Sequence, residues 1–106
     1  MERICFLLKV RAGKLAEYKQ RHARIWPEMI DALRQAGWHN YSLFLREDGL
    51  LVGYLETPNF SQALLKMKEQ PINEQWQRDM MPFFESIDSR LADDNMLRLE
   101  EVFHLD

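Results

Sequence analysis

The strongest sign of chemistry in this sequence is a short helical segment that carries a tyrosine, a histidine and a tryptophan. Tyr18 and His22 are one i, i+4 step apart, and Trp26 follows after four more residues. Side chains at this spacing lie on one face of a helix. An imidazole with a pKa of about 6.5 can accept and donate a proton near neutral pH. The segment therefore predicts proton transfer by His22, with Tyr18 placed to bind a hydroxyl or to orient the ring.

Each of these aromatic and polar side chains also has a structural interpretation. A histidine on an apolar helix face can simply be bonded to a backbone carbonyl. Tyr41 is either a second ligand for a hydroxyl group or a core aromatic residue. Trp76 is either a flat platform for the C–H face of a sugar or ordinary packing. The residues alone leave these alternatives open.

Other kinds of chemistry are disfavoured by the sequence. The four glycines form no phosphate-binding loop. The three histidines are far apart, with no His-x-x-x-His or Cys-x-x-Cys spacing that would predict a metal site. Adjacent acidic pairs such as Glu100-Glu101 point to opposite faces of a strand. We therefore predict proton transfer that uses no covalent intermediate, no metal and no cofactor.

Length and composition predict a single domain over residues 1–106 with an ordinary core, because 46% of the residues are hydrophobic. The net charge is −3 and the basic residues are scattered, which argues against a nucleic-acid or membrane partner. The apolar run 4–8 is too short to span a membrane, and no small-residue cleavage site follows it. We therefore expect a cytoplasmic protein in which the single cysteine, Cys5, is buried and inert.

The hydrophobic pattern predicts four strands and three helical segments. The predicted strands cover residues 3–10, 38–46, 50–56 and 97–105, and the helical segments cover 14–36, 60–69 and 73–84. We expect the first helical segment to kink or restart at Pro27, which lacks an N–H donor, and to end before Gly37. Asp48-Gly49 predicts a hairpin turn, Asn59 or Ser61 is expected near the cap of the next helix, and residues 86–95 are expected to form a solvated loop.

The order of these elements predicts an α+β protein of the ferredoxin-like β-α-β-β-α-β type with an antiparallel sheet. In the first strand Ile4, Phe6, Leu8 and Val10 share a face. In the second, His39, Tyr41, Leu43 and Leu45 are expected to share one. Helices cover only one side of such a sheet. An exposed apolar face on the other side predicts a partner chain.

Taken together, several short motifs resemble the L-rhamnose mutarotase family over essentially the whole chain. The motifs are Tyr18-x-x-x-His22-x-x-Ile25-Trp26-Pro27-Glu28, Gly37-x-His39-Asn40-Tyr41, Trp76 and Glu101-Val102-Phe103. The resemblance implies a cytoplasmic homodimer with the fold of a dimeric α+β barrel. It also implies an isomerase that interconverts the α and β anomers of L-rhamnose without a cofactor.

The resemblance assigns roles to five residues of this chain. His22 matches the general acid/base of the family, and Tyr18 and Tyr41 match tyrosines that bind the sugar. Trp76 matches the first of two adjacent tryptophans at the sugar site, whereas Gln77 stands where the second is usual. This departure affects the stacking side of the pocket and the preference among 6-deoxy sugars, and a glutamine there could hydrogen-bond a sugar hydroxyl.

Two other functions use the same kind of fold. A cofactor-free monooxygenase or small-molecule isomerase would act on aromatic or polyketide substrates, and its cavity would be more uniformly apolar. A ligand-binding dimer with a degraded site would bind sugar without exchanging its anomers. The second proton relay for a mutarotase could be a tyrosine, a carboxylate such as Glu101, or water.

Overall fold

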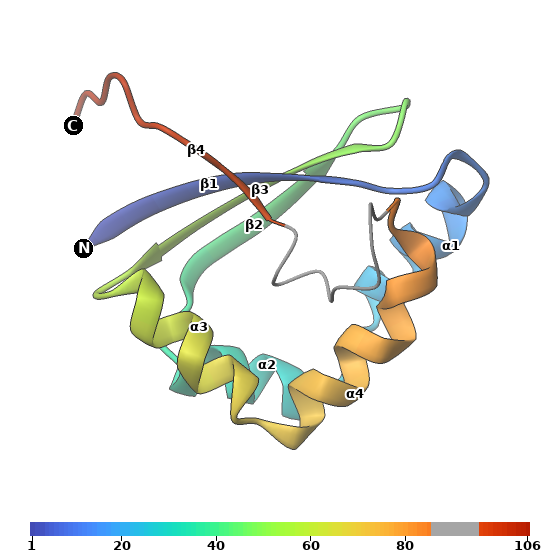
Figure 1. The fold of residues 1–106 in the computed structure, drawn as a ribbon, viewed down its shortest axis with the longest axis horizontal. Helices are drawn as coiled ribbons and strands as arrows, with labels where there is room; N and C mark the ends of the chain where they lie inside the picture. The colour runs from blue at the N-terminus through green and yellow to red at the C-terminus, as the bar shows by residue number, and fades with distance from the viewer. Residues whose placement is uncertain (86–95) are drawn as a thin grey trace.

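The computed structural model describes residues 1–85 and 96–106, in which four antiparallel strands form one sheet with four α-helices on one side (Figure 1). The strands are β1 (Glu2–Lys9), β2 (His39–Leu45), β3 (Leu50–Thr57) and β4 (Leu97–Leu99). The helices are α1 (Leu15–Ala23), α2 (Pro27–Gln35), α3 (Phe60–Lys68) and α4 (Pro71–Met80). The strands lie in the order β2-β3-β1-β4. The predicted α+β class with an antiparallel sheet is therefore confirmed.

The core lies between the sheet and the helices, and alternation along the strands builds it. Ile4 and Phe6 of β1 are buried, as are Leu51 and Leu55 of β3, which confirms the predicted inward face of the first strand. Gly53 lies opposite Phe6, and a Cβ atom at this glycine would be only 2.2 Å from Phe6 Cζ. The missing side chain therefore lets the Phe6 ring lie against the backbone of β3.

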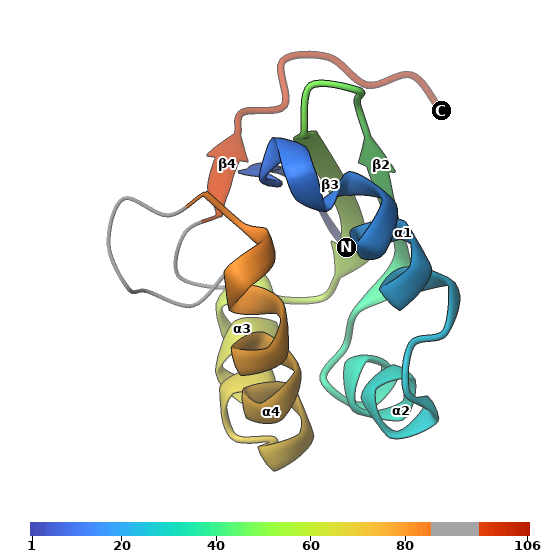
Figure 2. The same cartoon turned by 90° about the vertical axis from the view of Figure 1, so that its right-hand side faces the viewer.

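The predicted restart at Pro27 is confirmed. α1 ends at Ala23, and Pro27 is the first residue of α2, where its missing N–H costs no helical hydrogen bond. Tyr18 and His22 therefore share α1, but Trp26 lies in the connection between the two helices. This break frees the direction of α2 from that of α1, as Figure 2 shows.

Two glycine turns also form as predicted. Gly37 has φ +90° after the end of α2, and its N–H donates to Arg34 O while Trp38 N–H donates to Leu33 O. This pair of bonds is the Schellman arrangement that ends many helices. Gly49 has φ +97° in the turn between β2 and β3, where Arg46 N–H donates to Leu50 O.

The predicted face of His39 is wrong, because β2 contains a β-bulge. His39 pairs with Glu56 and Ser42 pairs with Tyr54, so three residues of β2 span a step that takes two in β3. Asn40, inside the bulge, has a positive φ of 46°. The extra residue reverses the alternation. His39 is consequently exposed on the outer face, whereas Tyr41 faces the helices.

The two helices in the second half of the chain form near the predicted positions, but their first and last residues differ from the prediction. Asn59 caps α3, because its Oδ1 accepts a hydrogen bond from Gln62 N–H at 3.1 Å. α4 begins at Pro71, two residues earlier than predicted, and ends at Met80, after which a 3₁₀ turn (Met81–Phe83) follows. The loop predicted over residues 86–95 lies outside the described residues.

The predicted last strand is too long. β4 covers only Leu97–Leu99, and residues 100–106 continue as an exposed segment without regular structure, which we call the C-terminal arm. The strand pairing with β1 ends where Leu99 lies opposite Cys5, although residues 2–4 of β1 extend beyond this pair. Beyond Leu99 the arm continues toward the N-terminal end of β1 (Figure 1), where Glu101 binds the side chain of Arg3. The apolar side chains of the arm stay in solvent; they are Val102, Phe103 and Leu105.

The outer face of the sheet has no helical cover in the described chain. It exposes Phe44, Leu97 and Leu99 to solvent. Cys5 lies on this face and is half-buried, not fully buried as predicted. No helix in the described ranges is both long and apolar enough to cross a membrane.

Candidate active site

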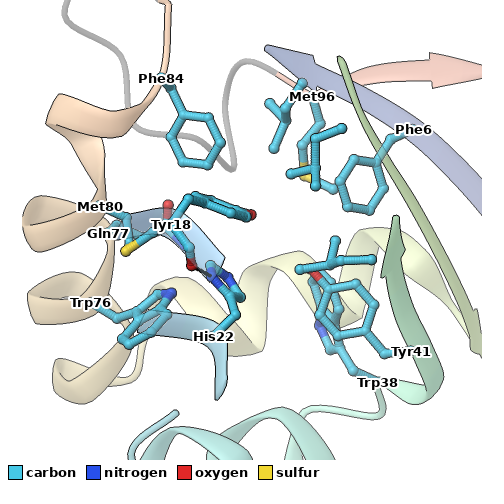
Figure 3. A pocket seen from close by; sticks show the side chains of 13 residues that line it. Phe6, Tyr18, His22, Trp38, Tyr41, Trp76, Gln77, Met80, Phe84 and Met96 are labelled. Carbon is cyan, nitrogen blue, oxygen red and sulfur yellow. Dashed lines mark hydrogen bonds between the residues drawn. The ribbon is translucent and has the colours of Figure 1, made fainter. Parts of the chain in front are cut away.

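The five residues predicted to form a site line one hollow between the sheet and the helices (Figure 3). Tyr18 and His22 come from α1, Tyr41 from β2, and Trp76 and Gln77 from α4. The hollow measures about 420 Å³, counting the part open to solvent. Its other walls are apolar: Phe6, Leu8, Trp38, Leu43, Leu51, Met80, Phe84 and Met96.

The hydrogen bond of His22 fixes which ring nitrogen can act as a base. Nδ1 lies 3.0 Å from the backbone oxygen of Tyr18. A carbonyl oxygen only accepts, so Nδ1 carries the hydrogen and Nε2 of the neutral ring has a free lone pair. Burial lowers the pKa of His22 below 6.5, although the bond to the Tyr18 carbonyl opposes this shift. At neutral pH the ring is therefore uncharged and basic at Nε2.

Tyr18 stacks on His22, with 4.1 Å between the ring centroids and 28° between the ring planes. The side chain is buried, and its edge contacts with Phe83 and Phe84 hold the ring in place. Burial raises the pKa of the Tyr18 phenol, so the hydroxyl stays protonated and can donate a hydrogen bond. Figure 3 shows this ring reaching from α1 into the hollow beside the imidazole.

Trp76 forms the wall on the other side of the imidazole. Its ring meets that of His22 edge to face at 5.6 Å. Trp26, from the connection between α1 and α2, packs edge to face against Trp76 at 5.0 Å. Trp76 is buried in this row of rings, so it is both a wall of the hollow and part of the core.

Gln77 shares the α4 wall and is joined to Asn73. Its Nε2 donates to Asn73 Oδ1 at 3.3 Å, and both side chains are buried. Asn73 does not appear in the sequence-based site, yet a signal for it exists: it precedes Gln77 by one i, i+4 step on the same helix.

Trp38 is a second residue that sequence reasoning missed. Its Nε1 donates to Ala63 O at 3.3 Å, and its ring lies edge to face with Tyr41 at 5.0 Å. Trp38 thereby holds one side of the Tyr41 ring. The ring of Phe6, in β1, lies 6.4 Å from the Tyr41 ring between centroids. The sequence signal was only its position directly after Gly37, where the chain enters β2.

Among the described residues, Glu101 and His104 lie apart from this hollow. Glu101 accepts two hydrogen bonds from Arg3, at 2.7 and 2.8 Å, on the surface near the C-terminal arm. His104 is bonded to Asp106 in the arm itself. Within residues 1–85 and 96–106, no group of three or more histidine, cysteine or acidic side chains is arranged to hold a metal ion.

Comparison with known proteins agrees with the family resemblance of the sequence motifs. The sequence model of the family described as L-rhamnose mutarotase matches residues 3–105. The L-rhamnose mutarotase of Oceanobacillus iheyensis is 40% identical over 109 residues, and that of Bacillus subtilis is 39% identical over 109 residues. Both alignments cover 100% of this chain and 100% of the relative.

A solved structure extends the agreement to three dimensions. The crystal structure of the L-rhamnose mutarotase from Formosa agariphila superposes with a TM-score of 0.82 and 26% sequence identity, and all of each chain is covered. The family match spans nearly the whole chain, and it is supported by relatives well above 30% identity. The chain therefore belongs to the L-rhamnose mutarotase family.

Proposed function

We propose that this protein interconverts the α and β anomers of L-rhamnose, with His22 as the general acid/base. The observation that carries the proposal is the imidazole of His22, neutral and basic at Nε2, at the wall of the hollow that Tyr18, Tyr41 and Trp76 also line. Membership of the L-rhamnose mutarotase family supplies the substrate.

The reaction opens and recloses a hemiacetal. The anomeric hydroxyl loses a proton while the ring oxygen gains one, and the C1–O5 bond breaks to give the open-chain aldehyde. Rotation about C1–C2 presents the other face of the carbonyl, and the 5-hydroxyl then adds to it. Nε2 of His22 takes the proton in one direction and returns it in the other, as microscopic reversibility requires.

Tyr18 is our candidate for the second proton relay. The anomeric oxygen and the ring oxygen are both bonded to C1, so the two proton transfers take place close together. The Tyr18 ring stacks on His22, and its raised pKa keeps a proton on the phenol that can be shared with the ring oxygen. Glu101 is bonded to Arg3 and does not line the hollow of its own chain.

The remaining predicted residues bind the sugar in this proposal. Trp76 offers the edge or face of an indole to the C–H groups of the ring, and Tyr41 offers a hydroxyl from the opposite wall. Gln77 offers an amide on α4 beside Trp76. An apolar hollow with a few polar groups is the usual form of a site for a small ligand.

The test of the function is proton NMR on equilibrated L-rhamnose. One anomeric proton is saturated, and transfer of saturation to the other is measured with and without protein. We expect transfer in proportion to the concentration of protein, above the spontaneous rate. Absence of any increase over the spontaneous rate would refute the proposed function. Oxygen uptake with quinol-like substrates tests the monooxygenase alternative, which the family match does not favour.

We further propose that the chain is one ferredoxin-like domain that pairs into a homodimeric α+β barrel through the outer face of the sheet. The strand order β2-β3-β1-β4 supports the ferredoxin-like assignment. Phe44 is 63% exposed and Leu97 is 63% exposed on the outer face, and Phe103 is 79% exposed in the C-terminal arm. Apolar side chains gathered in this way usually belong to an interface.

Light scattering after size exclusion tests the pairing. We expect a dimer for the wild type and a monomer, or a much weaker dimer, for Phe44→Asp. Leu65→Asp is the matched control, because Leu65 is also an exposed large hydrophobic residue but lies on α3. A monomeric wild type would refute the dimer and leave the catalytic proposal standing. A cytoplasmic location stays a prediction from the sequence and the family resemblance.

A further inference from the structure

Two buried amide side chains lie together on α4, beside the residues of the proposed reaction. Asn73 is 4% exposed and Gln77 is 8% exposed, and they are joined by the hydrogen bond from Gln77 Nε2 to Asn73 Oδ1. An amide side chain has both donors and acceptors for hydrogen bonds. An amide pair at the wall of a substrate hollow can therefore recognise a polar group of the ligand.

The pair borders a second hollow, which continues the first. This second hollow measures about 430 Å³, again counting the part open to solvent. The two hollows share six lining residues, so we treat them as two lobes of one site; the shared residues are His22, Trp38, Tyr41, Leu43, Trp76 and Gln77. His22 thus lies where the two lobes meet.

The second lobe is hydrocarbon on most sides. The residues that line it and not the first lobe are Ile25, Met29, Leu33, Met67 and Asn73. The Asn73 amide is the one polar side chain among these five. Together with the adjoining Gln77, it makes a polar wall in a chamber that is otherwise suited to a CH₃ or CH₂ group.

The sugar has one substituent with matching chemistry. The ring oxygen is bonded to C1 on one side and to C5 on the other, and C5 carries the exocyclic carbon. When C1 and the ring oxygen lie at His22, the exocyclic carbon is therefore only two bonds from the ring oxygen. In L-rhamnose this carbon is a methyl group, and in L-mannose, which has the same ring configuration, it is a hydroxymethyl group. A hydroxymethyl group combines a CH₂ for the hydrocarbon walls with a hydroxyl for the amides.

We propose that Asn73 and Gln77 form a subsite for a hydroxyl on the exocyclic carbon of the sugar, so that the enzyme accepts L-mannose as well as L-rhamnose. The inference rests on the proposed mutarotase function. Gln77 makes the contact with the hydroxyl. Asn73 is a positioning residue, because its Oδ1 holds the amide of Gln77 through their 3.3 Å hydrogen bond.

The first experiment needs only the wild-type protein and three sugars. Saturation-transfer NMR at several sugar concentrations gives kcat/KM for L-rhamnose, for L-mannose and for L-lyxose, which lacks the exocyclic carbon. We expect kcat/KM for L-mannose to equal or exceed that for L-rhamnose, with L-lyxose slowest. Exchange of L-rhamnose without exchange of L-mannose would overturn the subsite. Exchange of none of the three sugars would instead refute the mutarotase function.

Variants then assign the preference to the amide pair. Gln77→Met keeps the length of the side chain but removes the amide, and Asn73→Leu removes the acceptor that holds it. We expect each change to lower the ratio of kcat/KM for L-mannose to that for L-rhamnose by about 2- to 10-fold, which corresponds to one hydrogen bond.

Gln75→Met is the matched control, because Gln75 is exposed on the same helix. It should leave the ratio at the wild-type value. Thermal unfolding checks that each variant is folded. An unchanged ratio in folded Gln77→Met would overturn the subsite, and the wild-type comparison of sugars decides the question even if a variant does not fold.

Discussion

Replacing His22 by asparagine tests the proposed catalytic role with little change to the surrounding structure. The Nδ2 group of asparagine can occupy the place of the imidazole Nδ1, which lies 3.0 Å from Tyr18 O in the wild type. The substitution therefore keeps a donor for this carbonyl but removes Nε2, the only basic atom of the side chain. It also removes the stack on Tyr18, and an aromatic pair of this kind contributes about 0.5–1.5 kcal/mol.

The expected effect on the rate is much larger than the effect on stability. General acid/base catalysis by a positioned side chain contributes about 100- to 10,000-fold, equivalent to roughly 3–5 kcal/mol of the activation barrier. We expect His22→Asn to lower kcat for L-rhamnose exchange by this factor. The free energy of unfolding should fall by only about 1 kcal/mol, because the side chain is half-buried.

The assay is saturation transfer between the two anomeric protons of L-rhamnose, corrected for spontaneous exchange, together with urea unfolding of each protein. His39→Asn is the matched control, since it makes the same chemical change at an exposed histidine on the other face of the sheet. A folded His22→Asn protein that exchanges anomers at the wild-type rate would refute the reasoning. So would an equal loss in His39→Asn.

Four further predictions concern protonation at the site and packing in the sheet. The catalysed rate should be level near pH 7 and fall in acid with a midpoint below 6.5, because burial lowers the pKa of His22; a midpoint above 6.5 in a pH series would contradict this. Between that lowered pKa and 6.5 the unfolded chain binds more protons at His22 than the native chain does. The stability that His22 contributes is therefore present above pH 6.5 and is lost as the pH falls. Urea unfolding at pH 5 and 7.5 should show this loss of stability in the wild type and not in His22→Asn. Tyr18→Phe keeps the stack but removes the hydroxyl, and kcat should fall by about 10-fold or more in the NMR assay, whereas an unchanged kcat would exclude Tyr18 as the relay. Gly53→Ala places a Cβ 2.2 Å from Phe6 Cζ and should cost about 1–3 kcal/mol in urea unfolding, while Gly13→Ala, with no atom within 4 Å, should cost far less.

Local features of the chain were predictable because short-range physics decides them. The i, i+4 spacing of Tyr18 and His22 places both on one face of α1, whatever packs against it. Pro27 had to begin a helix or disturb one, and Gly37 could adopt the positive φ that ends α2. These positions follow from steric limits on one or a few residues.

Some errors in the prediction came from pairing between strands, which no short stretch of sequence determines. The bulge in β2 turns His39 away from the face of Tyr41, because the register depends on what β3 offers opposite each residue. β4 pairs with β1 only from Leu97 to Leu99, although β1 extends to Glu2 beyond the pair of Leu99 with Cys5. The length of a strand depends on its hydrogen bonds to the neighbouring strand, and the sequence of one strand alone does not show them.

The features of the candidate site also divide into those set by local sequence and those set by tertiary packing. The residue types and their spacing were enough to show which side chains could do chemistry, including the imidazole of His22. The folding of distant segments was needed to bring Trp76 of α4 against His22 of α1 and to place the Asn73–Gln77 pair at the wall of the same site. The tertiary structure also decided that Nδ1 of His22 is bonded to Tyr18 O, which leaves Nε2 as the base. Proton affinity and contact depend on burial and on atoms far away in the chain, and these exist only once the helices have closed over the sheet.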